Sequence, residues 1–173
     1  MGIHITGVGS YIPSHKERNQ DFLAHTFLDD SGNPFGAENG DIIEKFKAIT
    51  GIEERRYAKP HQTASDLAFL AAEKAIEDAS LDPETLDYII VAHNFGDVQH
   101  GCIQTDILPS LATRVKHNLQ IKNPNCVAYD LIFGCPGWVE GVIQAQAFIK
   151  SGMAKRCMVI GADTLSRIAD QND

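Results

Sequence analysis

Several features that mark other classes of protein are missing from this sequence of 173 residues. No apolar run approaches the roughly 18 residues that a membrane-spanning helix needs, and the first residues have no signal-peptide architecture. Lysine and arginine together number 15 against 23 aspartates and glutamates, which gives a net charge of −8. Because a nucleic-acid-binding face needs a basic patch, we expect a cytoplasmic protein with no membrane span and no nucleic-acid partner.

Cysteine is also scarce and shows no metal-binding spacing. The four cysteines, at positions 102, 126, 135 and 157, form no CxxC pair and no zinc pattern. His100 and Cys102 are two candidate ligands without a helical or CxxC frame, so their proximity is read as incidental. We therefore expect no metal site, and reduced cysteines without structural disulfides, as in intracellular proteins.

What the sequence does contain is a regular alternation of strand and helix patterns, in a chain of the size of one domain. Strands are predicted over residues 3–9, 88–92, 126–132 and 157–160, and helices over 17–28, 41–49, 63–79, 110–119 and 136–150. Asp41 is predicted to cap the helix 41–49 and Gly51 to break it, and Thr63 with Asp66 is predicted to form a capping box that opens the helix 63–79. The continuous apolar run at 88–92 is typical of a strand buried on both faces of a parallel sheet. The alternation predicts an α/β fold of three layers, α/β/α, with a mostly parallel mixed sheet.

The predicted helix over 136–150 is apolar on nearly all sides, with Trp138, Val139 and Ile143 among its large residues. A helix that is apolar all round is typically buried rather than lying at the surface. We therefore expect this helix to be covered on every side.

Cys135 stands where that helix begins. The strand 126–132 leads through Gly134 to the cysteine, and Pro136 suits the first helical position because its missing N–H has no intrahelical partner there. This order predicts a tight strand-to-helix turn with the cysteine at the positive end of a helix dipole, an environment that favours the nucleophilic thiolate. The alternative is a small buried cysteine that fills a gap beside a sheet.

Other polar residues near predicted strand ends admit both functional and structural interpretations. His93 ends the strand 88–92, so parallel strands would bring it to the same sheet edge as Cys135. A Cys–His pair is therefore conceivable, although a histidine at a strand end is more often an anchor. Asp163 and Arg167 are read as an internal ion pair.

Four segments in order resemble the N-terminal half of a 3-oxoacyl-[acyl-carrier-protein] synthase III, the beta-ketoacyl-ACP synthase III of the thiolase superfamily. They are residues 50–55 (Thr-Gly-Ile-Glu-Glu-Arg), 89–92 (Ile-Ile-Val-Ala), 130–138 around Cys135, and 159–167, which begins Val-Ile-Gly-Ala-Asp. Each segment alone is weakly specific, whereas the ordered set over the whole chain is specific to the superfamily. The resemblance implies a thiolase-like fold, with residues 1–173 as the N-terminal half-domain.

The resemblance also implies a reaction, a decarboxylating Claisen condensation. Cys135 would accept an acyl group from coenzyme A or an acyl carrier protein as a thioester, and malonyl-ACP would then lose CO₂ and attack it. In the family a histidine and an asparagine complete the site, and both lie in the second half of the chain, which this sequence does not contain. The expected protein is an acyltransferase of fatty-acid or specialised lipid synthesis, without a permanently bound cofactor, and inactive as an isolated fragment.

Two further expectations follow from the resemblance. The region 94–120 is expected to form a homodimer interface, and Lys45 and Ile49 replace a Trp and an Arg that sandwich the adenine of coenzyme A in acetyl-CoA-primed members. The missing pair favours a different acyl donor and a specialised initiating enzyme. A rival function is a non-catalytic half-thiolase interaction subunit, whose apolar helix 136–150 a partner would cover.

Overall fold

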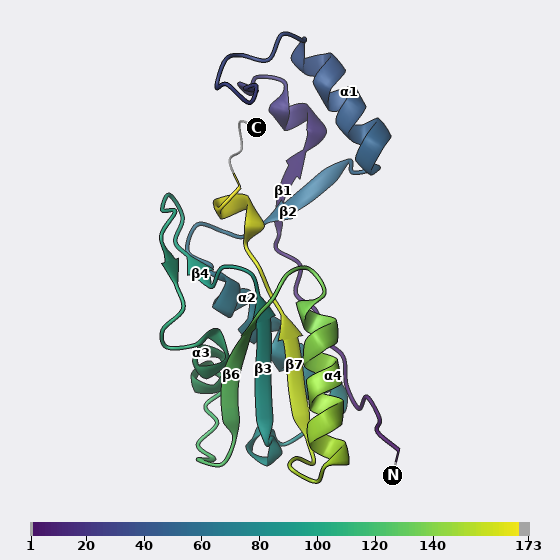
Figure 1. Cartoon of the computed structure of the whole chain (residues 1–173), viewed down its shortest axis with the longest axis vertical. Coiled ribbons are helices and arrows are strands. Elements are labelled where there is room, and N and C mark those ends of the chain that lie inside the picture. The colour runs from purple at the N-terminus through teal and green to yellow at the C-terminus, as the bar shows by residue number, and fades with distance from the viewer. Residues whose placement is uncertain (1, 170–173) are drawn as a thin grey trace.

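A three-stranded parallel sheet forms the centre of the molecule in the computed structural model, which describes residues 2–169. Its strands are β6 (Val127–Ile132), β3 (Tyr88–His93) and β7 (Cys157–Gly161), with β3 in the middle (Figure 1). The side chains of β3 are almost wholly shielded from solvent. The prediction of a buried parallel strand at this position is confirmed.

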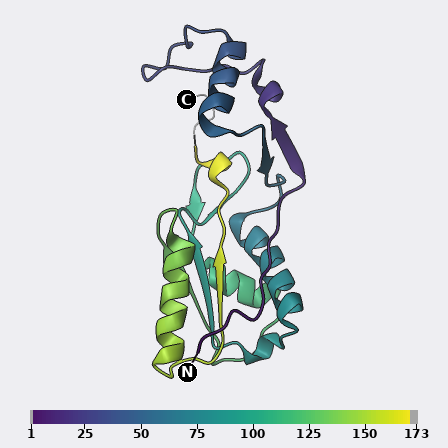
Figure 2. The ribbon, with the colours of Figure 1, turned by 90° about the vertical axis from the view of Figure 1, so that its right-hand side faces the viewer.

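Helices cover both faces of this sheet. α2 (Ala64–Ala79) and α3 (Leu111–Asn118) pack on one face, where Ile89 and Val91 join them in the core. α4 (Gly137–Lys150) packs on the opposite face, where Ile90 points, and Figures 1 and 2 show the sheet between the two layers. The predicted three-layer α/β/α arrangement is therefore confirmed.

A smaller lobe extends from one end of the sheet (Figures 1 and 2). It contains β1 (His15–Arg18) and β2 (Glu54–Tyr57), which pair in antiparallel fashion, the 3-10 helix η1 (Asn19–Phe22) and the helix α1 (Asn39–Thr50). Phe27 packs edge-on against Phe46 of α1, with ring centroids 5.7 Å apart. This aromatic contact holds α1 against the loop that precedes it.

Several local predictions are confirmed by hydrogen bonds at the helix ends. Thr63 and Asp66 form the expected capping box at the start of α2, and the Ser110 hydroxyl accepts the Thr113 N–H at the start of α3. Gly51 ends α1 at a φ of 68°, in the left-handed region that favours glycine. The cap predicted for α1 is wrong, because the helix begins at Asn39 and Asp41 lies inside its first turn.

The remaining short elements complete the chain. They are the 3-10 helices η2 (Pro83–Thr85) and η3 (Leu165–Arg167) and the two-residue strands β4 (Asp97–Val98) and β5 (Thr105–Asp106). β4 and β5 pair with each other in antiparallel fashion within the otherwise irregular segment 94–107.

Two predicted elements near the N-terminus are wrong. Residues 3–9 are extended but form no strand, because they run along α2 and not beside another strand; the Val8 N–H, for example, donates to Asp78 of that helix at 2.9 Å. The predicted helix 17–28 is replaced by the end of β1, then by η1 and loop. There, backbone pairing of β1 with β2 outweighs a weak helical pattern.

The expected burial of α4 on every side is also wrong for the described part of the chain. Its sheet-facing stripe consists of Gly137, Gly141 and Ala145, which are buried. Trp138 and Ile143, in contrast, are 49% and 54% exposed. Small residues let the helix approach the sheet closely, and among residues 2–169 no element covers its outer face.

Candidate active-site turn

Cys135 occupies the turn between the carboxyl end of β6 and the N-terminus of α4. The Gly137 N–H donates to the Gly134 carbonyl at 2.8 Å and closes the turn around Cys135 and Pro136. Pro136 is the N-cap of α4 and not its first helical residue, a shift of one position from the prediction. Cys135 is exposed, so the interpretation as a buried gap-filling residue is wrong and the thiol is open to a substrate.

Close packing fixes this turn against the sheet. A methyl group added at Gly137 would lie 3.2 Å from the Cβ atoms of both Ala92 and Phe133. One turn further along α4, a methyl group on Gly141 would lie only 2.7 Å from Val159. Glycine at these positions therefore brings the helix N-terminus, with its partial positive charge, directly over the strand ends.

His93 is close to this turn in the fold but is not available as a partner for Cys135. Its side chain is fully buried, and its Nε2 lies 3.0 Å from Asp130 Oδ2. Its Nδ1 accepts the Gly96 N–H at 2.9 Å, which fixes the tautomer with the proton on Nε2. Both ring nitrogens are thus engaged elsewhere, and His93 is an anchor of the sheet edge.

Asp130 is the other half of that anchor. It also accepts the N–H groups of Leu111, at 2.7 Å, and Ala112, at 2.8 Å, at the start of α3. Burial alone would raise the pKa of Asp130, but the hydrogen bonds from His93 and from the two backbone amides outweigh burial and lower it. The carboxylate is therefore ionised near neutral pH and ties β6 to both β3 and α3.

The expected ion pair between Asp163 and Arg167 is wrong. Asp163 accepts two hydrogen bonds from Asn94, one from its backbone N–H at 3.0 Å and one from its side-chain amide at 2.6 Å. Arg167 donates instead to the carbonyls of Val98, at 2.6 Å, and Lys59, at 2.7 Å. Each residue joins the segment after β7 to a different part of the chain.

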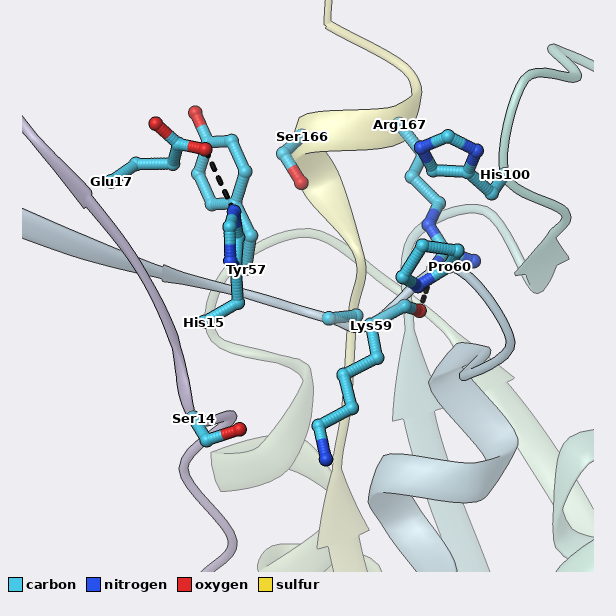
Figure 3. A pocket seen from close by; sticks show the side chains of 10 residues that line it. Ser14, His15, Glu17, Tyr57, Lys59, Pro60, His100, Ser166 and Arg167 are labelled. Atoms are coloured by element: carbon cyan, nitrogen blue, oxygen red, sulfur yellow. Dashed lines mark hydrogen bonds and ion pairs between the residues drawn. The ribbon is translucent and has the colours of Figure 1, made fainter. Parts of the chain in front are cut away.

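A surface hollow of about 530 Å³ lies near this segment, between the base of the lobe and η3 (Figure 3). His100 and Arg167 line one side, and His15, which hydrogen-bonds to Glu17 at 2.8 Å, lines the other. Sequence reasoning missed this hollow because its residues come from segments far apart along the chain. Cys135 is not among its lining residues, so the hollow does not form part of the turn.

No metal site or membrane-spanning helix accompanies these features in the part of the chain that the structure describes. Among residues 2–169, no group of three or more His, Cys, Asp or Glu side chains could hold a metal ion. The same residues include no helix long and apolar enough to cross a membrane.

The fold defines a class of protein, those with the thiolase-like α/β fold. Solved structures of 3-oxoacyl-[acyl-carrier-protein] synthase III resemble this chain closely. The enzyme from Thermus thermophilus superimposes on 96% of this chain and 44% of its own, with a TM-score of 0.76 and 32% sequence identity. The enzyme from Aquifex aeolicus covers 97% of this chain and 47% of its own, also with a TM-score of 0.76 and 32% identity.

Sequence comparison points to the same family. The profile described as 3-Oxoacyl-[acyl-carrier-protein (ACP)] synthase III matches residues 129–173, which include Cys135. The beta-ketoacyl-[acyl-carrier-protein] synthase III of Neisseria meningitidis is 39% identical over 169 residues, which are 98% of this chain and 46% of that protein. The recognition made from sequence is confirmed: the chain is a partial relative of the synthase III family, and it spans about half the length of the curated relatives it matches.

Proposed function

We propose that this chain is the N-terminal, cysteine-bearing part of a synthase III-type ketosynthase, and that Cys135 is its acyl acceptor. The observation that carries the proposal is the exposed Cys135 in a closed turn at the N-terminus of α4, in a chain 39% identical to a synthase III over almost its whole length. A thiol at a helix N-terminus is well placed for nucleophilic attack.

The proposed reaction has two steps. The Cys135 thiolate attacks the carbonyl carbon of an acyl-CoA or acyl-carrier thioester, and the carrier leaves as its thiolate, so that the acyl group is now on Cys135. Malonyl-ACP then loses CO₂, its carbanion attacks the acyl carbonyl, and Cys135 leaves as the 3-oxoacyl-ACP forms. The Cys135 N–H at the turn would support the carbonyl oxygen during each attack, with little rearrangement.

Residues outside this chain are proposed to complete the site. His93, whose backbone contacts the segment before the turn, is not free to act on Cys135, since its ring is bonded to Asp130 and Gly96. The second step, which requires stabilisation of the malonyl-derived carbanion, is therefore proposed to need the rest of the protein. We expect the isolated chain to accept an acyl group but not to catalyse condensation.

The choice of acyl donor is proposed to differ from acetyl-CoA. Lys45 and Ile49 both lie on exposed parts of α1, and Ile49 is 81% exposed. Neither offers the planar stacking surface of a tryptophan for an adenine ring. Competition between acetyl-CoA and longer or aromatic acyl-carrier donors, measured with a protein that contains both halves, tests this choice; a strong preference for acetyl-CoA would contradict it.

The rival function, a non-catalytic interaction subunit, is favoured by one observation. The outer face of α4 exposes Trp138, Val139 and Ile143 by about half each, and contiguous apolar surface commonly marks a site of association. Light scattering and an acylation assay of Cys135, taken together, discriminate between the two functions. Self-association without acylation of Cys135 would favour the interaction subunit. A homodimer through residues 94–120 is a further proposal, and the same light scattering tests whether a dimer forms at all.

A further inference from the structure

The carboxylate of Asp130 joins three elements beneath the Cys135 turn. It lies on β6, five residues before Cys135, and only 9% of its side chain is exposed. Its two oxygens accept three hydrogen bonds, from the imidazole of His93 at the end of β3 and from the Leu111 and Ala112 N–H groups at the start of α3. A buried carboxylate with several donors holds its neighbours in one arrangement.

His93 of β3 is also held through its main chain, by the segment that leads into the Cys135 turn. The Phe133 N–H, two residues before Cys135, donates to the His93 carbonyl at 3.2 Å. His93 is thus fixed by its side chain at Asp130 and by its main chain at Phe133. A change at the first contact will be transmitted to the second, because both act on one residue.

Close packing carries this constraint to the helix that follows Cys135. A methyl group on Gly137 would lie 3.2 Å from the Cβ atoms of both Phe133 and Ala92, the residue next to His93. A packed contact of this kind transmits small displacements, since protein interiors have few voids to absorb them. The end of β3 therefore acts on both sides of the turn, at Phe133 before it and at Gly137 after it.

We propose that Asp130 is a positioning residue for the Cys135 turn, acting through His93. The proposal rests on the proposed role of Cys135 as acyl acceptor. Asp130 sets the position of the β3 end relative to β6, and through it the position of the thiol and of the backbone N–H groups at the start of α4.

Asp163 provides a matched comparison. It is also a partly buried carboxylate with two hydrogen bonds to the end of β3, both from Asn94. It lies after β7, however, and not on the strand that runs into Cys135. Loss of Asp163 removes a comparable anchor from the same strand end without touching β6.

The chemistry of the substitution Asp130→Asn is well defined. The carboxylate accepts N–H donors on both oxygens, whereas a carboxamide has one accepting oxygen and one NH₂ group. In one orientation of the new carboxamide its NH₂ group faces the Ala112 N–H, and in the other it faces both His93 and the Leu111 N–H. The variant therefore keeps the size of the side chain and breaks one or two bonds of the network.

The experiment compares D130N and D163N in the full chain of 173 residues, at a temperature where circular dichroism shows both to be folded. The rate of iodoacetamide modification is measured at Cys135, with the exposed Cys102 of the same molecule as internal standard. We expect D130N to slow modification of Cys135 at least fivefold and leave Cys102 within twofold. D163N should leave the modification rates of both cysteines within twofold of wild type, even if it destabilises the chain as much as D130N does.

Two additions keep the test decisive. H93F is measured beside D130N and replaces it if D130N does not fold, because phenylalanine keeps the approximate size of the ring and removes the hydrogen bond to Asp130 whichever way the D130N carboxamide is turned; we expect about threefold slowing at Cys135. Where wild-type Cys135 accepts an acyl group, D130N should lower the maximal single-turnover rate without changing the half-saturating thioester concentration.

Equal rates of Cys135 alkylation in D130N and D163N, or a D130N rate within twofold of wild type, would overturn the proposal. Failure of acylation in wild type would count against the proposed function alone, since the alkylation rates still decide the role of Asp130.

Discussion

Gly137 and Ala92 meet so closely that a methyl group on the glycine would lie 3.2 Å from the alanine Cβ. This contact sets the N-terminus of α4 on the end of the central strand β3. The helix, the strand end and the turn that carries Cys135 therefore form one packed unit. The accessible thiol lies on a closely packed, hydrogen-bonded turn, which suits a nucleophile that must meet a substrate carbonyl in a fixed orientation.

Gly141 tests the packing of that unit. Its added methyl group would lie 2.7 Å from Val159 on β7, so Gly141→Ala must displace α4 or the strand. We expect a loss of about 1–3 kcal/mol in the free energy of unfolding, as overpacked cores show. Urea denaturation measures it.

Gly40→Ala serves as the control for that substitution, because open space surrounds Gly40 in α1. Alanine there should leave stability unchanged or raise it by about 0.4–1 kcal/mol. Equal effects of the two substitutions would show that α4 is not packed as closely as the structure has it.

The four cysteines are expected to differ sharply toward alkylating reagents. Cys102 and Cys135 are exposed and should react first. Burial raises the pKa of Cys126, and it raises the pKa of Cys157 to about 11, so both stay protonated at about pH 8 and should react slowly. Peptide mass spectrometry after brief iodoacetamide treatment measures the order, and fast labelling of Cys157 at that pH would contradict it.

Asp87 is expected to make stability depend on pH. Hydrogen bonds from the Lys155 N–H, at 2.6 Å, and the Arg156 N–H, at 3.0 Å, hold the start of β7 to this carboxylate. The Lys155 bond makes the largest contribution to a lowered pKa of Asp87; burial opposes it, and the Arg156 bond adds to it. Because the folded-state pKa lies below the unfolded value, the contribution is complete above about pH 4 and is lost as pH falls through the folded pKa.

Asp87→Asn should therefore lower stability by about 1 kcal/mol at pH 7. The difference from wild type should begin to shrink below about pH 4 and disappear as pH falls through the lowered folded-state pKa, where wild-type Asp87 itself becomes protonated. Thermal or urea unfolding across about pH 3–7 measures both curves, and a difference that is constant over this range would refute the assignment.

The outer face of α4 is expected to contribute little to the stability of this chain. Ile143 is 54% exposed, so Ile143→Ser should change the free energy of unfolding by less than about 0.5 kcal/mol, as for other surface positions. The same change should reduce self-association and the binding of a hydrophobic dye. A loss of several kcal/mol in the monomer would mean that Ile143 is buried within the chain.

The sequence was most informative where local chemistry determines local structure. The capping box of Thr63 and Asp66, the break at Gly51 and the buried strand before His93 all depend on patterns within a few residues, and all are confirmed. The turn around Cys135 belongs to the same group, since Gly134 and Pro136 specify it locally.

Features that depend on distant partners could not be predicted in this way. Residues 3–9 alternate like a strand, yet strand formation requires a neighbouring strand, and the neighbour is α2. The network of Asp130 was missed because its partners, His93 and Leu111, lie 37 and 19 residues away. The identity of β6 as a strand was clear from the sequence, but the face to which its one carboxylate points was not.

The most direct test of the central claim is the intact mass of the chain after incubation with a panel of acyl-CoA and acyl-carrier thioesters, with Cys135→Ala as control. If Cys135 is the acyl acceptor, one acyl group is added to the wild-type chain, the mass increase identifies the preferred donor, and the variant shows no adduct. Absence of any adduct on wild type, or an adduct that persists in Cys135→Ala, would contradict the assignment of Cys135 as the nucleophile.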